Sequence, residues 1–230
     1  MTAPIQFIDL QAQRRRLGDK LERSIMDAVR GGQWVMGPQV RELEKRLSEF
    51  VGVKHTIACA NGTDALLIVL RAWEIGPGDA VFVPTFTFAA SAEVVALVGA
   101  SPVFVDVLED TYNMDPASLE AAIAMVKREG SLKPRAVMPV DLFGQTADYR
   151  VIEPICKREG LKMLCDAAQG FGALLDGRRA GGIGDAASTS FFPAKPLGCD
   201  GDGCATVTNA DALAEIMRTI RANGQGSDKD

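Results

Sequence analysis

Histidine is nearly absent from this sequence, since His55 is the only one in 230 residues. A Ser-His-Asp or Cys-His hydrolase uses histidine as its base, so this scarcity argues against both classes. The five cysteines form no C-x2-C pair, which argues against a zinc site, and we expect no metal. Because their number is odd and their spacing is unpaired, we expect reduced thiols in a cytoplasmic protein rather than a disulfide framework.

Long hydrophobic runs, an excess of basic residues and a dinucleotide fingerprint are also missing. No stretch is long and apolar enough to cross a membrane, and the first six residues do not resemble the core of a secretion signal. The formal net charge is −5, so we expect neither a nucleic acid nor a membrane as partner. No G-x-G-x-x-G follows the first expected strand, which argues against an NAD-binding dehydrogenase.

What the sequence does contain is a regular alternation of short apolar runs and helical patterns. Apolar residues at helical spacing predict a helix over 10–29 and a second over 38–50. We then expect strands at 56–60, 80–83, 102–105, 136–140, 161–165, 189–192 and 205–208, with helices at 65–73, 89–98, 116–126, 149–158 and 212–222. This alternation predicts a three-layer α/β/α domain, with a mostly parallel central sheet covered on both faces.

One lysine stands in an unusual setting, because the stretch from Ser190 to Gly198 places Lys195 between two phenylalanines and a glycine-rich run. Burial there would disfavour the charged form of the amine, which frees it to attack a carbonyl and form a Schiff base. The glycines allow the backbone to approach a bulky planar group. The alternative is a surface loop with a solvated lysine, and Lys195 alone does not exclude it.

Two further candidate sites fall at the carboxyl ends of expected strands, where open parallel sheets bind ligands. Asn61-Gly62-Thr63 begins a helix, and the exposed amides and the helix dipole there suit a phosphate. An ordinary helix cap explains the same residues. Phe86 and Phe88 follow another strand, where an aromatic ring either stacks on a flat ligand or packs in the core.

The segment Asp166-Ala167-Ala168-Gln169 follows the apolar strand expected at 161–165. Asp166 is placed to pair with a cationic ring nitrogen, and Gln169 to hydrogen-bond a ring substituent, although a helix N-cap by Asp166 is the alternative. Together with Lys195, Ser190 and the helix start, these residues supply what pyridoxal phosphate needs. The cofactor requires an anion cradle, a ring stack, a carboxylate for its ring nitrogen and an amine for its aldehyde.

Four motifs, in this order, resemble the DegT/DnrJ/EryC1/StrS nucleotide-sugar aminotransferases, a family of fold-type I pyridoxal-phosphate enzymes: Gly62-Thr63-Asp64-Ala65-Leu66, Pro84-Thr85-Phe86-Thr87-Phe88, Asp166-Ala167-Ala168-Gln169 and Ser190-Phe191-Phe192-Pro193-Ala194-Lys195-Pro196-Leu197-Gly198. The resemblance implies that residues 1–230, N-terminal helices included, form the cofactor-binding large domain of a fold-type I aminotransferase. Family members continue into a smaller C-terminal domain, which we expect to be absent from this chain.

The resemblance also assigns roles to individual residues. It implies Lys195 as the Schiff-base lysine and proton shuttle, and Asp166 as the partner of the pyridine nitrogen. Gln169 would contact the phenolic oxygen of the ring. Phe88 would stack on the ring, with Phe86 as the second choice. The phosphate would be held by three residues: Gly62, Thr63 and Ser190.

The function implied by the resemblance is transamination of a keto nucleotide-sugar, with pyridoxal 5'-phosphate as cofactor and glutamate as amino donor, by a homodimer. Within the family, the resemblance points to the enzymes that aminate a 3-keto UDP-N-acetylglucosaminuronic acid for bacterial surface polysaccharide. Two alternatives stay open. One is a catalytically silent relative that binds the cofactor or a nucleotide-sugar, and the other is a sugar dehydratase of the same family. Lys195 disfavours the dehydratase, because that branch is expected to carry histidine there.

Overall fold

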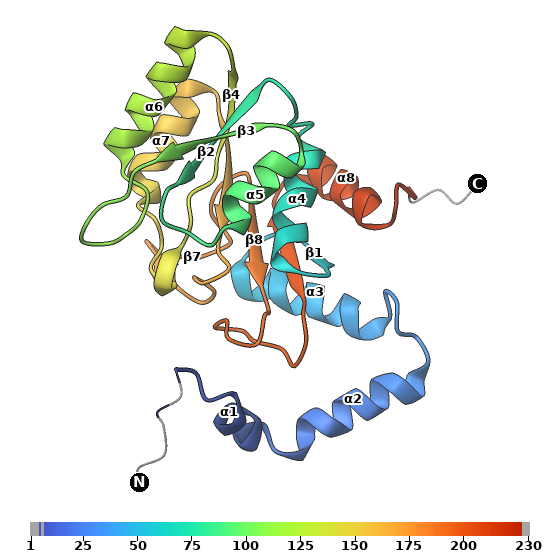
Figure 1. Cartoon of the computed structure of the whole chain (residues 1–230). Coiled ribbons are helices and arrows are strands. Elements are labelled where there is room, and N and C mark those ends of the chain that lie inside the picture. Colours follow the sequence, from blue (N-terminus) through green and yellow to red (C-terminus); the bar gives the residue numbers. More distant parts are fainter. Residues whose placement is uncertain (1–4, 6, 227–230) are drawn as a thin grey trace.

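A seven-stranded sheet lies at the centre of the molecule (Figure 1). The computed structural model describes residue 5 and residues 7–226. The strands are β1 (His55–Cys59), β2 (Asp79–Pro84), β3 (Ser101–Val105), β4 (Lys133–Val137), β5 (Lys162–Asp166), β8 (Ala186–Ser190) and β9 (Cys204–Thr208), in the spatial order β1-β9-β8-β5-β4-β2-β3. Strands β3, β2, β4, β5 and β8 pair in parallel, and β9 runs antiparallel to both β8 and β1. The predicted mostly parallel sheet is therefore confirmed.

Helices cover both faces of the sheet, as predicted (Figure 1). On one face lie α6 (Pro116–Glu129) and α7 (Tyr149–Glu159), and on the other lie α4 (Gly62–Ala72), α5 (Ala90–Leu97) and α8 (Asp211–Arg221). Strand β2 has both faces buried: Phe82 belongs to the core under α6 and α7, whereas Val81 and Val83 belong to the core under α4 and α5. Its side chains are apolar on both faces because neither face meets water.

The helix termini follow the local sequence. Pro116 occupies the first turn of α6, where its missing N–H costs nothing, and the Asp115 carboxylate accepts from the Ala117 N–H at 2.9 Å. Gly130 ends the helix in the left-handed conformation, with φ 67°. Helix α3 (Pro38–Val51) packs its buried Leu47 against the sheet at the β9 end.

The single helix predicted over 10–29 is wrong, because the segment forms two helices, α1 (Leu10–Leu17) and α2 (Asp19–Gly31). Gly18 separates them with φ 59° and ψ −150°, a conformation that breaks the helical hydrogen-bond pattern. Neither helix contains a buried residue. Figure 1 shows both running beside the body of the molecule as an arm, rather than covering the sheet.

Four smaller features also differ from the prediction. Strand β8 ends at Ser190, so Phe191 and Phe192 lie in the following loop, and β4 ends at Val137 instead of residue 140. A hairpin of β6 (Leu174–Leu175) and β7 (Arg178–Arg179) was not expected, because two-residue strands are too short to show an alternating pattern. A short 3-10 helix, η1 (Leu142–Gly144), was not expected either.

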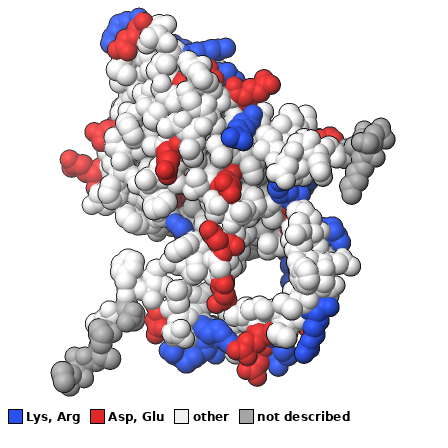
Figure 2. All heavy atoms as spheres, turned by 45° about the vertical axis from the view of Figure 1, so that its right-hand side comes forward, with Lys and Arg blue, Asp and Glu red and all other residues white. Residues whose placement is uncertain are grey.

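The surface carries charges of both signs. On the face in Figure 2, acidic and basic side chains are both present and lie scattered among uncharged ones. In the α1–α2 arm, Arg14 pairs with Glu22. Within the described residues, no helix has the length and apolar character needed to span a membrane.

Candidate active site

A cavity of about 750 Å³ opens where the carboxyl ends of β5 and β8 meet the N-terminus of α4 and the loop after β2. The structure brings all seven sequence-predicted site residues into its wall: Gly62, Thr63, Phe88, Asp166, Gln169, Ser190 and Lys195. A second cavity, of about 610 Å³, lies between α3 and β1 and contains none of them.

The start of α4 and the end of β8 form an anion cradle. Asn61 is the N-cap, because its Oδ1 accepts from the Asp64 N–H at 2.9 Å, so the helix-cap interpretation holds for that residue. The first-turn amides of Gly62 and Thr63 have no acceptor within the helix and carry the positive end of its dipole. A Cβ at residue 62 would lie 3.2 Å from Cβ and 3.4 Å from Oγ of Ser190. Glycine there lets the Ser190 hydroxyl approach the helix terminus.

Asp166 ends β5 with only 6% of its surface exposed. Its Oδ2 accepts from the Ser91 hydroxyl at 2.9 Å, and its Oδ1 from the Ala168 N–H at 3.2 Å. Burial raises the pKa of the Asp166 carboxyl, while the Ala168 N–H, the Ser91 hydroxyl and the positive charge of Lys195 act to lower it. No helix begins at Asp166, so the helix-cap alternative is wrong for this residue, and its carboxylate lines the cavity.

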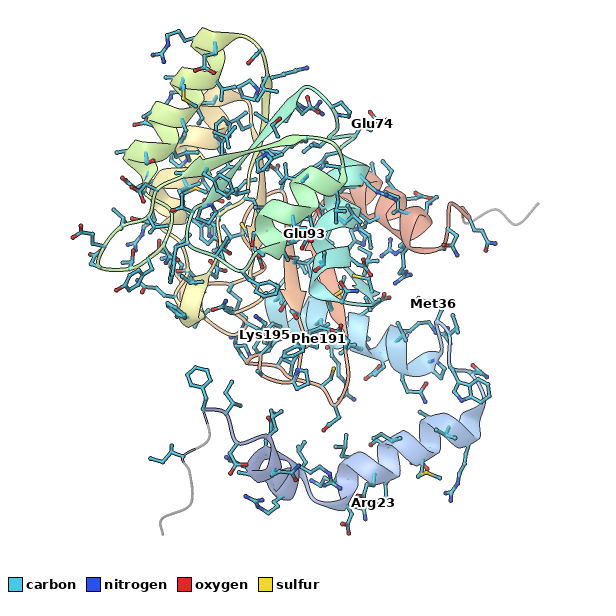
Figure 3. The ribbon with its side chains drawn as sticks, viewed as in Figure 1. Arg23, Met36, Glu74, Glu93, Phe191 and Lys195 are labelled. Carbon is cyan, nitrogen blue, oxygen red and sulfur yellow. The ribbon has the colours of Figure 1, made fainter. Side chains whose placement is uncertain are left out.

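Lys195 lies in a tight turn between β8 and β9 (Figure 3). Its N–H donates to the Phe192 carbonyl at 2.8 Å. A Cβ at Gly198 would come 2.2 Å from the Pro193 carbonyl oxygen, so only glycine allows the turn to close. Phe191 anchors the turn by packing against Leu47 of α3. The Lys195 side chain is half-buried in the cavity wall, so its removal from solvent is partial.

The two phenylalanines after β2 have different surroundings. Phe88 lines the cavity with 70% of its surface exposed, which leaves its ring free to contact a ligand. Phe86 does not line the cavity, and its ring contacts those of Tyr112 and Phe143, with centroids 5.5 and 6.2 Å away. The geometry therefore favours Phe88 over Phe86 as a stacking residue.

Comparison with known proteins places this geometry in a family. Residues 16–230 match the model of the DegT/DnrJ/EryC1/StrS aminotransferase family. The chain belongs to this family. A curated relative, the UDP-2-acetamido-2-deoxy-3-oxo-D-glucuronate aminotransferase of Pseudomonas aeruginosa, is 50% identical over 221 residues, which cover 96% of this chain and 60% of the relative.

Solved structures of the family have the same fold. A DegT DnrJ EryC1 StrS aminotransferase from Brucella abortus superposes with a TM-score of 0.96 at 54% identity, over 98% of this chain and 61% of that one. The PLP-form of a putative sugar aminotransferase from Streptococcus pneumoniae gives a TM-score of 0.81 at 30% identity, over 92% of this chain and 57% of that one. The chain thus spans about three fifths of the length of the relatives it matches. The predicted family and fold class are confirmed.

In this DegT-family site, the sequence did not predict the residues that hydrogen-bond to Gln169 and Asp166 and fix their side chains. Gln169 is fixed by its Oε1, which accepts from the Phe143 N–H at 2.9 Å. Asp166 is fixed by Ser91, which is fully buried on α5. The available signal was weak, because Ser91 and Phe143 lie far from their partners in sequence and belong to no motif that was singled out.

Proposed function

We propose that the protein is a pyridoxal-phosphate-dependent aminotransferase acting on a keto nucleotide-sugar. The observation that carries this proposal is the single cavity that combines an anion cradle, a buried carboxylate, an exposed ring and a lysine amine. The fit to the cofactor is supported by the cradle at Gly62, where a Cβ would fill the space beside Ser190. Pyridoxal phosphate would supply an electron sink for moving an amino group.

Each residue of the chain would then have a separate task. The amides of Gly62 and Thr63 and the hydroxyl of Ser190 would bind the phosphate. Asp166 would hold a proton at the ring nitrogen, in a charge-assisted hydrogen bond that Ser91 orients from behind. Lys195 would bind the aldehyde carbon and move a proton at its Nζ.

The side-chain amide of Gln169 and the ring of Phe88 would position the cofactor. Because Gln169 Oε1 already accepts from Phe143, its amide nitrogen is the atom that would face the phenolic oxygen. Phe88 would stack on the ring, since its surface is open to the cavity.

The substrate class is supported by the relatives. The P. aeruginosa relative is named for a UDP-linked 3-oxo sugar acid, and we propose a keto nucleotide-sugar of that kind as acceptor, glutamate as donor and surface polysaccharide as the pathway. We also propose a cytoplasmic homodimer. The cytoplasmic location is supported by the cysteines, all five of which are free. The homodimer is supported by the arm, where Leu17, Ile25 and Val29 expose apolar surface that a second copy would cover. A monomer by light scattering would contradict the dimer.

A two-stage spectroscopic assay tests the function. Protein loaded with pyridoxal phosphate is expected to show the visible absorption of covalently held cofactor, to lose it with glutamate, and to regain it with a keto nucleotide-sugar. Lys195→Ala is expected to lack the absorption and the activity. Lys162→Ala, which removes an exposed lysine from the strand that carries Asp166, is the matched control. Activity that persists in Lys195→Ala overturns the proposal.

A further inference from the structure

Asp141 is a fully buried carboxylate that none of the roles above uses. It lies just beyond β4, where the chain pairs with the end of β5. The Asp141 N–H donates to the Asp166 carbonyl at 2.9 Å, and the Asp166 N–H donates to the Pro139 carbonyl at 2.9 Å. Val140 faces the cavity, so its neighbour Asp141 points to the opposite side of the sheet, toward α7. The backbone of Asp141 is therefore tied to the candidate ring-nitrogen partner.

The Asp141 side chain closes the loop that follows it. Its Oδ1 accepts from the Ala147 N–H at 3.0 Å and from the Tyr149 hydroxyl at 2.7 Å, and the Tyr149 side chain is also fully buried. One carboxylate oxygen thus joins the start of the segment 141–147 to its end. Asn113 supports the loop from outside by donating to the carbonyls of Gln145 and Thr146.

The tip of this loop holds Gln169. Phe143 adopts φ 55°, in the left-handed region that costs a non-glycine residue energy, so surrounding contacts must hold it there. In that conformation its N–H donates to Gln169 Oε1. Asp141 also touches the chain just after Gln169, because a Cβ at Gly170 would lie 2.5 Å from Asp141 Cβ.

No cation among the described residues bonds to this carboxylate, so hydrogen bonds alone hold it. The ionisable groups that face it are Tyr149 from α7 and Cys165 and Asp166 from β5. Burial raises the pKa of both Tyr149 and Cys165, which keeps both groups neutral near neutral pH, and of the two only Tyr149 donates to Asp141. Asp141 Oδ2 has no hydrogen-bond partner in the described structure. A buried group left so incompletely paired needs an explanation.

We propose that Asp141 is a positioning residue, which closes the 141–147 loop through Ala147 and Tyr149 so that the Phe143 N–H orients the Gln169 amide toward the cofactor ring. This inference rests on the proposed function, because it assigns Gln169 to the cofactor. Its consequence is specific: Asp141 acts on the cofactor only through Gln169.

Hydrogen exchange of the cofactor-free protein tests the loop. Tyr149→Phe removes one of the two hydrogen bonds to Asp141 Oδ1 that close the loop and is expected to speed exchange in the 142–147 segment about tenfold, and Asp141→Ala at least as much. Asp141→Asn retains Oδ1 and is expected to stay near wild type. Tyr112→Phe, a change in the chain's only other tyrosine, is the matched control. Unchanged exchange in both Tyr149→Phe and Asp141→Ala overturns the loop-closing role.

The absorption of the bound cofactor tests the positioning. Asp141→Ala and Gln169→Leu are each expected to shift the pH midpoint of that absorption in the same direction, and Asp141→Ala is expected to add nothing when Gln169 is already leucine. Tyr149→Phe serves in place of Asp141→Ala if alanine prevents folding. Additive shifts, or no shift despite faster exchange, overturn the inference. A wild-type protein that binds no cofactor overturns the proposed function, whereas unchanged variants of a protein that binds it overturn only the role of Asp141.

Discussion

Replacing Asp141 by asparagine is expected to remove a pH dependence from the stability of the fold. Burial raises the pKa of Asp141 from 3.8 to about 7, against the lowering effect of the Tyr149 and Ala147 hydrogen bonds. The folded protein therefore keeps a proton that the unfolded chain releases. This contribution to stability is complete below pH 3.8 and is lost as the pH rises to about 7. A shift of about 3 units corresponds to about 4 kcal/mol, because each unit is worth about 1.36 kcal/mol.

The assay is urea unfolding of wild type and Asp141→Asn at a series of pH values from about 4 to 8. The difference between the two free-energy curves cancels the titrating groups that do not interact with Asp141. That difference is expected to change by about 3 to 4 kcal/mol across the range, in the direction of wild-type stability lost at high pH. Asp148→Asn, which removes an exposed negative charge near the same loop, is the control. Parallel curves for wild type and Asp141→Asn would refute the reasoning.

Two further substitutions test the cradle and the support of the carboxylate. Ser91→Ala removes the hydroxyl that donates to Asp166 and is expected to lower the free energy of unfolding by about 2 kcal/mol in urea. Thr87→Val, which loses a hydroxyl contacting Ser91 but not the carboxylate, is expected to cost less, and an equal loss would count against the assignment. Gly62→Ala places a methyl group against Ser190 and is expected to weaken pyridoxal-phosphate binding about tenfold in a titration, with little change in unfolding of the cofactor-free protein. Unaltered affinity would argue against the cradle.

The positions of Gly62, Asp166 and Ser190 could be predicted because each ends an apolar strand or begins a helix. Asp166 ends β5 and Ser190 ends β8, and parallel strands that are neighbours bring their carboxyl ends together. The residues that hold them could not be predicted in the same way. Ser91 lies 75 residues before Asp166, on the helix after β2. The two residues come together because only β4 lies between β2 and β5 in the sheet, and this strand order cannot be read from the sequence.

The N-terminal arm marks another limit of sequence patterns. Leu17, Ile25 and Val29 form the apolar stripe of an amphipathic helix, and such a stripe indicates that a face will be covered without indicating by what. In this structure the stripe stays exposed, and Gly18 breaks the helix. The missed hairpin did carry a signal, because Asp176-Gly177 is a turn pair for two-residue hairpins, and both residues have positive φ.

The end of β5 is held from both faces of the sheet, and this arrangement follows from strand alternation. The Asp166 side chain points to the α5 face, where Ser91 holds it, while Asp141, bonded to the Asp166 backbone, points to the α7 face, where Tyr149 holds it. Under the proposed function the Asp166 carboxylate meets a ring nitrogen and needs a fixed orientation, which the Ser91 hydrogen bond on the α5 face provides. The Ser91 hydrogen bond from α5 does not fix the 141–147 loop, and therefore does not fix Gln169, which the Phe143 N–H of that loop orients. The buried Asp141 is therefore best explained as the residue that fixes this loop, and Gln169 through it, on the α7 face of the sheet.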